Sequence, residues 1–361
     1  MIGRTIGLYL SGRFIRTIAL VFLTMFTLIY LIDFVEMLRR ASDIQGTTTA
    51  FIAFLTLLRV PSVSEQVLPF AVLFGAMAAF LNLSRKLELV VARAAGLSAW
   101  QFLTPPVLIV LLLGIFAVSV YNPLSAVLKQ RADRIETRLF GKTGRDDADT
   151  SLWIRQKSVD GQAILRAERS SDAGTSLSGV TAFVYEPDGR FLERIEAAHA
   201  TLSPGFWTME EARVLVPGEE PSDHAAFILA SNLTPEQVTQ SFVAPDTVPF
   251  WDLPGLGERT EKAGLDATGY RLRYQQLLAR PLLLIAMVLA AASFSLRFFR
   301  FGGVAWMVSG GVVAGFVLYV ASKLVGDLGG AGLLSAPVAA WSPAIAGIML
   351  GMLALLHQED G

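Results

Sequence analysis

Two pairs of arginines stand where apolar stretches of this chain give way to polar sequence. Arg39 and Arg40 end the first apolar stretch, and Arg131 and Arg134, three residues apart, follow the third. A guanidinium group can make two parallel hydrogen bonds to one phosphate, so paired arginines suit the binding of a phosphorylated lipid. The alternative is that these side chains only reach toward a membrane surface or lie on solvated helix faces. Charge alone leaves both interpretations open.

Sequence motifs for catalysis and nucleotide binding are missing. Gly141-Lys142-Thr143 resembles the end of a phosphate-binding loop, but Glu136 stands where that motif requires its first glycine. Neither a GxSxG nor an HExxH motif occurs, so we predict no catalytic residues. The chain has no cysteine and only three histidines, far apart in sequence, so we expect no cofactor and no thiolate or histidine-rich metal site. Carboxylate metal sites remain open.

The loop between the second and third apolar stretches holds a third group of residues. Leu87, Val90, Val91 and Ala94 would share one face of a helix, and Gly96 is a natural helix end. Such a helix either rests on the lipid surface or docks into a cytoplasmic partner. The candidate docking residues are Arg85, Glu88, Leu89, Val90, Val91, Ala94 and Gly96.

Six apolar stretches must position these residues. Each approaches the roughly 20 residues that a helix needs to cross the ~30 Å hydrocarbon layer, and a helix satisfies its own backbone polar groups there. A composition of 53% hydrophobic and 17% charged residues also indicates a membrane protein. The predicted spans are Phe14–Val35, Val67–Leu83, Phe102–Tyr121, Leu277–Leu296, Gly303–Val325 and Val338–Leu356.

The second span is expected to be longer than its most apolar part. Phe51–Val60 is also apolar, but Pro61, Glu65 and Pro69 interrupt the sequence that follows. Because proline removes a backbone donor and bends a helix, we expect an interfacial helix that leads into the span.

Positive charges in the short loops predict the orientation of the chain. They gather before the first span and after the second and fourth spans, at Arg4, Arg13, Arg16, Arg85, Lys86, Arg93, Arg297 and Arg300. The positive-inside rule therefore places both termini in the cytoplasm and Asn122–Arg273 outside. The first apolar run is too long for the core of a signal peptide, so we interpret it as a retained helix. A net charge of −1 makes a nucleic-acid partner unexpected.

The residues between the third and fourth spans have the pattern of strands. Thr150–Lys157, Gly161–Glu168 and Gly179–Tyr185 alternate apolar and polar residues. Glu186–Arg190, with the sequence EPDGR, is a turn signal that joins the last of these strands to Phe191–Ala197. These patterns predict an all-β sandwich or jelly roll.

The predicted fold class is an α-helical membrane protein with six transmembrane helices and an inserted all-β, jelly-roll-like domain. Residues 1–121 carry the first three helices and the docking segment 84–96. Residues 122–273 form the β-domain, with a helical lead-in over Leu124–Leu139, and residues 274–361 carry the last three helices.

Two segments and this layout resemble the LptF/LptG (YjgP/YjgQ) family of lipopolysaccharide-export permeases. Phe34–Ala41, with the sequence FVEMLRRA, is similar to the segment that ends the first helix in that family. Glu88–Gly96 resembles the cytoplasmic coupling helix of the family, and the layout covers essentially the whole chain. The sequence patterns FVxxLRRA and ELVV resemble LptG more than its paralogue LptF.

This resemblance implies a permease subunit of an ABC exporter in the bacterial inner membrane. Such an exporter extracts lipopolysaccharide and passes it to a periplasmic bridge toward the outer membrane. The implied partners are an LptF-like permease, an LptB-like ATPase dimer that hydrolyses the ATP, and an LptC-like bitopic protein. Arg131 and Arg134 keep the spacing of a basic pair in the family.

The sequence departs from the family pattern at Asp33. Members carry a lysine just before the Phe-Val pair, where this chain has Asp33. The departure weakens the transfer of a phosphate contact to this position, and it raises the idea of a differently phosphorylated lipid A.

Lipid A carries acyl chains and anionic phosphates, so its site needs apolar walls with cations at the outer rim. Arg39 and Arg40 are candidates for the rim. The candidate wall residues of the first and fifth spans are Phe26, Tyr30, Phe316 and Tyr319.

Other interpretations also account for this layout. The chain could be the LptF-type paralogue, a membrane enzyme that modifies envelope lipids, or a scaffold that only recruits partners. An enzyme would need titratable residues that converge at the membrane face, and the insert shows no recognisable set. Co-purification of an ATPase with the chain would favour a permease over the enzyme and the scaffold.

Overall fold

The computed structural model describes most of the 361 residues. The exceptions are residues 1–3, 43, 45–46, 89–90, 92–93, 95, 97, 141–151, 159–160, 172–173, 187, 236–237, 239–242, 263–265, 298–303 and 360–361. The chain divides into a helical unit (Met1–Ile135, Val248–Trp251 and Arg271–Gly361) and a β unit (Glu136–Thr247 and Asp252–Tyr270).

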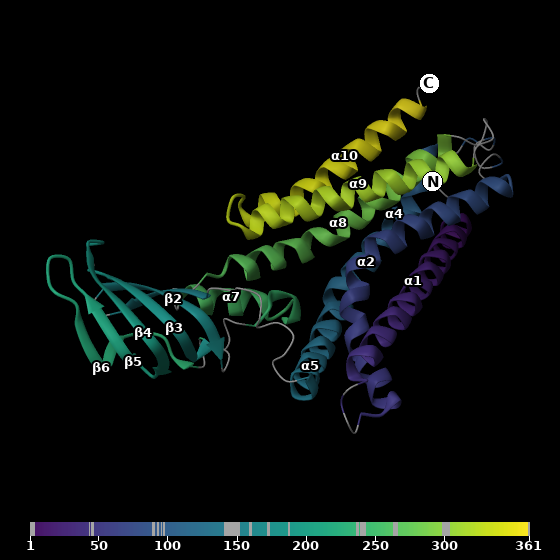
Figure 1. Ribbon diagram of the computed structural model, residues 1–361. Helices are drawn as coiled ribbons and strands as arrows, with labels where there is room; N and C mark the ends of the chain where they lie inside the picture. Colours follow the sequence, from purple (N-terminus) through teal and green to yellow (C-terminus); the bar gives the residue numbers. More distant parts are fainter. Residues whose placement is uncertain are drawn as a thin grey trace. The chain divides into compact units, whose positions relative to one another are not determined.

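Among the described residues, the helical unit contains six helices with a stretch long and apolar enough to cross a membrane, which confirms the predicted spans (Figure 1). They are α1 (Arg4–Ala41), α2 (Thr49–Arg85), α4 (Ala99–Phe116), α8 (Thr268–Arg297), α9 (Val304–Gly330) and α10 (Ala336–Glu359). The third span is extended, because α4 continues through a π-helical turn, Ala117–Tyr121, into α5 (Asn122–Phe140).

The second span is one continuous helix rather than an interfacial helix followed by a span. Helix α2 begins after Thr48, whose side chain accepts a hydrogen bond from the backbone of Phe51, and it contains both Pro61 and Pro69. Packing accounts for the continuity, since Val60, Ser64 and Leu68 around the prolines are buried, although each proline still removes one backbone hydrogen bond.

The helical unit has two ends. Both chain termini lie at one of them, which we call the terminal end (Figure 1). Helices α1, α4 and α9 run away from it toward the opposite end, which we call the exit end (Figure 1).

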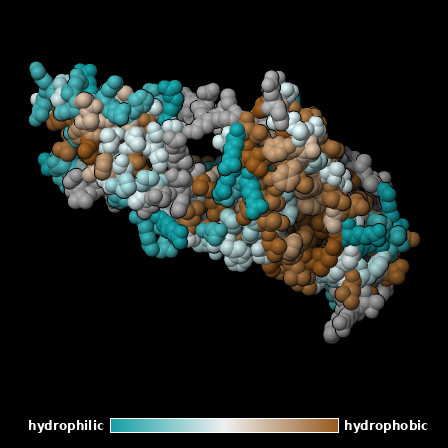
Figure 2. All heavy atoms as spheres, turned by 90° about the horizontal axis from the view of Figure 1, so that it is seen from below, coloured by the Kyte–Doolittle hydropathy of each residue, from teal (hydrophilic) through white to brown (hydrophobic). Residues whose placement is uncertain are grey.

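The six helices differ in how far the rest of the unit covers them. In the most apolar stretches of α2 and α8, 67% and 61% of residues are buried, whereas the values for α1 and α9 are 6% and 11%. Hydrophobic side chains accordingly cover much of the helical unit's surface (Figure 2). Helices α1 and α9 therefore have apolar faces that the described part of the chain leaves open to lipid or to another subunit.

Glycines allow the central helices to approach closely. A Cβ atom on Gly75 of α2 would lie 2.6 Å from the Cα atom of Ile18 in α1, and one on Gly114 of α4 would lie 2.6 Å from that of Pro281 in α8. Small residues at such crossings are typical of membrane helices, where van der Waals packing drives association.

The β unit contains one antiparallel sheet whose six strands follow chain order. The strands are β1 (Leu152–Ser158), β2 (Gly161–Ser171), β3 (Ser176–Tyr185), β4 (Phe191–Ser203), β5 (Phe206–Leu215) and β6 (Ser222–Ala230). The predicted turn between β3 and β4 is confirmed, with Gly189 N–H donating to Glu186 O over 2.9 Å. Helix α7 (Leu253–Lys262) follows the sheet.

The alternation of buried residues shifts by one position in three neighbouring strands. Successive buried residues lie three apart at Leu177 and Val180 in β3, Ala197 and Ala200 in β4, and Met209 and Ala212 in β5. Gly179 and Glu211 have positive φ angles of 63° and 53° at these breaks. Such breaks bend a strand and re-aim its side chains. The described strands thus form one six-stranded antiparallel sheet with a single core cluster, which confirms the predicted inserted all-β domain.

Candidate functional site

Arg39 and Arg40 lie together on the last turn of α1, at the exit end. Both bind Glu36 of the same helix, with Arg39 Nη2 3.0 Å and Arg40 Nε 2.9 Å from its carboxylate oxygens. Their side chains are 77% and 51% exposed. The pair can therefore reach an external anion, but Glu36 competes for the same donors.

Asp33, the residue at which the chain departs from the family pattern, binds a cation of the neighbouring helix. Arg59 Nε of α2 lies 3.6 Å from Asp33 Oδ1. Arg59 Nη1 also contacts Met37 Sδ at 3.7 Å. Arg59 thus supplies positive charge at this level of α1, and Asp33 partly neutralises it.

Arg131 and Arg134 both lie on the exposed side of α5. Their three-residue spacing places them on one helix face, as expected for a basic pair. They belong to a different helix from Arg39 and Arg40.

The predicted aromatic wall residues do not form one cluster. Phe26 packs on Phe22, with ring centroids 6.4 Å apart, and Tyr30 stacks on Phe34 at 6.0 Å, all within α1. Tyr319 of α9 packs on Phe70 of α2 with centroids 4.8 Å apart.

Phe316 of α9 is 57% exposed. Among the described residues, ring contacts do not join the aromatic side chains of α1 to those of α9.

Glu88 of the predicted docking segment faces helix α1. Tyr9 Oη donates to Glu88 Oε2 over 3.1 Å, and Arg13 Nη1 lies 3.2 Å from Glu88 Oε1. The Arg13 and Glu88 side chains are 15% and 32% exposed, so water screens this ion pair only partly. Glu88 thus fastens the segment to the beginning of α1.

The segment is not one helix from residue 84 onward. Helix α2 ends at Arg85, and Leu87 has a φ of 60°, which interrupts the helix before a new turn in which Val91 N–H donates to Leu87 O. Val91 and Ala94 are exposed, as a docking face requires.

The docking segment ends where α4 begins. Gly96 has a φ of 83°, and Ser98 then caps α4 through a capping box with Gln101. Leu89 and Val90 lie outside the described residues.

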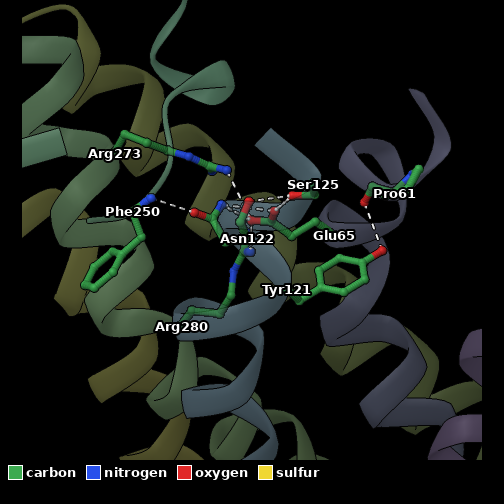
Figure 3. Close-up of polar contacts among 8 residues, drawn as sticks. All are labelled: Pro61, Glu65, Tyr121, Asn122, Ser125, Phe250, Arg273 and Arg280. Carbon is green, nitrogen blue, oxygen red and sulfur yellow. Dashed lines mark hydrogen bonds and ion pairs between the residues drawn. The ribbon is translucent and has the colours of Figure 1, made fainter. Parts of the chain in front are cut away.

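A buried polar cluster at the exit end escaped the sequence interpretation (Figure 3). Glu65 of α2 is only 2% exposed. Asn122 Nδ2 donates to both of its oxygens, at 3.1 and 3.0 Å, and Ser125 Oγ donates at 2.8 Å. Arg273 Nη2 lies 3.2 Å from Glu65 Oε1, and Arg280 Nη1 pairs with the same oxygen. We call these five residues the Glu65 cluster.

One sequence signal could have revealed this cluster. Glu65 lies between the apolar segment Phe51–Val60 and the second predicted span, and Arg280 lies inside the fourth. Charged side chains within membrane helices are expected to pair with one another, so these two were candidate partners.

The family follows once these features are combined with a comparison to known proteins. A family model described as lipopolysaccharide export system permease LptF/LptG matches residues 8–357. The chain belongs to this family. With its six apolar helices, the permease is a multi-pass inner-membrane protein.

Curated relatives match the permease over most of their length. It is 24% identical over 327 residues to the lipopolysaccharide export system permease protein LptG of Escherichia coli (strain K12), a match that covers 89% of each chain. It is 21% identical over 336 residues to the LptG protein of Haemophilus influenzae, covering 90% of each chain.

Proposed function

We propose that the permease is the LptG-type subunit of an ABC exporter that extracts lipopolysaccharide from the inner membrane and passes it to a periplasmic bridge. The observation that carries this proposal is the family match over residues 8–357, on a chain with six apolar helices around an inserted β unit. The named relatives are LptG proteins, which favours this type over the LptF paralogue.

The partners follow from what one chain lacks. The open apolar faces of α1 and α9 suit an LptF-like permease and an LptC-like bitopic protein. The exposed Leu87 and Val91 beside the Glu88 contact suit docking of an LptB-like ATPase dimer. In this arrangement both termini and the docking segment are cytoplasmic, and the β unit is periplasmic.

The energetics require such an ATPase. Removing acyl chains from a bilayer costs about 0.8 kcal/mol per CH₂ group, so extraction of a lipid with several chains is strongly uphill. In the proposed arrangement the chains lie along Phe26, Tyr30, Phe316 and Tyr319. The head-group phosphates then meet Arg39 and Arg40, with Arg131 and Arg134 as a second cationic contact.

Reconstitution tests this function. The permease would be purified with its candidate partners and placed in proteoliposomes that contain lipopolysaccharide, and ATP-dependent release to a soluble periplasmic acceptor would be measured. We expect release only with ATP and with the ATPase present. An assembled complex that hydrolyses ATP but releases no lipopolysaccharide would contradict the proposal, and failure to recover any ATPase would favour a scaffold.

The double change Arg39→Glu with Arg40→Glu probes the rim. Because it reverses both charges, it should abolish release while basal ATP hydrolysis continues, and the double change to lysine should be partly tolerated. Normal release by the double glutamate variant would leave these residues as interfacial anchors and shift the lipid contact to Arg131 and Arg134.

A further inference from the structure

The Glu65 cluster joins three helices of the helical unit. Glu65 belongs to α2, Asn122 and Ser125 belong to α5, and Arg273 and Arg280 belong to α8 (Figure 3). Two guanidinium groups against one carboxylate give it a net charge of +1. A buried carboxylate with four such partners is held firmly, because removing one partner would leave charge unpaired in a dry environment.

The cluster also anchors the segments by which the chain leaves and re-enters the helical unit. Helix α5 leads into the β unit after Ile135, and α8 returns to the helical unit at Arg271. Residues Val248–Trp251 also belong to the helical unit, and hydrogen bonds hold them beside Asn122. Phe250 N–H donates to Asn122 Oδ1 over 3.0 Å, and Trp251 Nε1–H donates to Ser119 O over 3.2 Å.

Each of the three helices has a weak point beside the cluster. In α2, Pro61 and Pro69 lie four residues before and after Glu65. In α8, Pro281 directly follows Arg280, and in the third helix the π-helical turn Ala117–Tyr121 directly precedes Asn122. Prolines and π-turns are the usual places at which helices bend, because backbone hydrogen bonds are missing or displaced there.

A rigid connection flanked by bendable points is the arrangement of a pivot. We propose that Glu65 is a positioning residue of the export cycle. Its cluster is the fixed point about which α2, α5 and α8 bend, so that movement at the terminal end reaches the segments leading into the β unit. This inference rests on the proposed export function, and Glu65, which is only 2% exposed, acts through its partners in the cluster.

Glu65→Gln tests the pivot, because glutamine keeps the size of the side chain and removes the charge that holds the two arginines. In proteoliposomes with the full complex, we expect lipopolysaccharide released per ATP hydrolysed to fall at least about tenfold. ATP hydrolysis should stay within about twofold of the unchanged complex. The unchanged complex separates the two proposals, because absence of release there would defeat the export function itself.

Distance measurements supply a readout that a merely structural role would not change. The chain has no cysteine, so introduced pairs can be spin-labelled specifically. Phe54 and Val127, which are 53% and 39% exposed, report on the exit end, and the exposed Lys86 and Gln101 report on the terminal end. Vanadate trapping should change both spin-label distances in the otherwise unmodified complex. In Glu65→Gln, the distance between the labels at the terminal end should still change, and the distance between those at the exit end should not.

Ser125→Ala keeps the test decisive if the Glu65→Gln complex does not assemble. This change removes one 2.8 Å hydrogen bond of the cluster and leaves the ion pairs, so release per ATP should fall about two- to threefold. Ser322→Ala in α9 is the matched control, because the Ser322 hydroxyl donates within its own helix to Leu318 O over 2.8 Å and contacts no member of the cluster. Wild-type release per ATP and wild-type distance changes in an assembled Glu65→Gln complex would overturn the pivot. If only Ser125→Ala assembles, the same result in that variant would overturn it.

Discussion

Arg39 and Arg40 are not free cations, because each donates to Glu36 one turn earlier in α1. Two arginines and one carboxylate leave a net charge of +1 at the exit end of the helix. An incoming phosphate must therefore displace Glu36 from at least one guanidinium group. If the pair binds lipid phosphates as proposed, Glu36 lowers the affinity by competing for the same donors.

Glu36→Gln should strengthen lipopolysaccharide binding if the two arginines meet its phosphates. Exposed ion pairs of this kind are weak, so we expect a gain in affinity of about two- to fivefold, largest at low ionic strength. Fluorescent lipopolysaccharide titrated into the purified complex would measure it. The triple change that also converts Arg39 and Arg40 to glutamine should show no gain. Equal affinity of Glu36→Gln and wild type for lipopolysaccharide would indicate that Arg39 and Arg40 only anchor the helix at the membrane interface.

Glu88 has two possible partners, the ATPase and α1, and the structure gives it the second one through Tyr9 and Arg13. If the ion pair connects the docking segment to α1, Arg13→Ala and Glu88→Ala should each lower ATP-driven release by about three- to tenfold. The double variant should be no worse than either single one, because residues in contact are non-additive. Independent losses that multiply in the double variant would show that Glu88 acts through the ATPase alone.

At the scale of elements, the apolar runs predicted all six spans because the thickness of the bilayer sets their length. The strand pattern predicted the hairpin at Glu186–Arg190 for an equally local reason, since the turn residues carry their own φ preferences. Two features were not local. The continuity of α2 through Pro61 depends on burial by neighbouring helices, and the phase shift at Glu211 depends on the strands beside it. Neither the continuity of α2 nor the phase shift in β5 can be predicted from the sequence of that element alone.

Gly75→Ala should destabilise the helical unit even though alanine favours helices. The new Cβ atom would lie 2.6 Å from a backbone atom of Ile18, so α1 and α2 would have to separate, at a cost of about 1–3 kcal/mol. Thermal unfolding of the purified permease in detergent would show the loss. Gly12→Ala in α1, with no atom within 4 Å of its Cβ, is the matched control and should be neutral or slightly stabilising. Equal melting temperatures for the two variants would contradict the close approach.

At the scale of the whole molecule, long-range pairing is what the sequence could not supply. Glu65 was interpreted as an interruption of a span, yet its partners Arg273 and Arg280 lie 208 and 215 residues further along the chain. Periodicity describes one helix at a time and cannot match charges across an inserted unit. The proposed orientation in the membrane likewise depends on the entire chain, because it rests on positive charges in loops before the first span and after the second and fourth.

Single cysteines in the cysteine-free chain can test this orientation. Asp188→Cys lies in the exposed turn between β3 and β4, and Lys86→Cys lies just after α2. A membrane-impermeant maleimide added to spheroplasts should label Asp188→Cys at once and Lys86→Cys only after permeabilisation. The unmodified chain, which has no thiol, is the background control. The opposite labelling pattern would invert the proposed topology.

The long sequence separation between Glu65 and its arginine partners also affects how the nascent chain folds during synthesis. At synthesis rates of roughly 5–20 residues per second, the 208 residues between Glu65 and Arg273 take roughly 10–40 s to translate. During that interval the strands of the sheet can pair in the order in which they emerge, whereas Glu65 has only Asn122 and Ser125 to meet. The nascent chain therefore passes through a stage with an uncompensated carboxylate among apolar helices. We expect chains truncated before Arg273 to be degraded faster in pulse-chase experiments than chains that end after α8, and Glu65→Gln should slow that degradation.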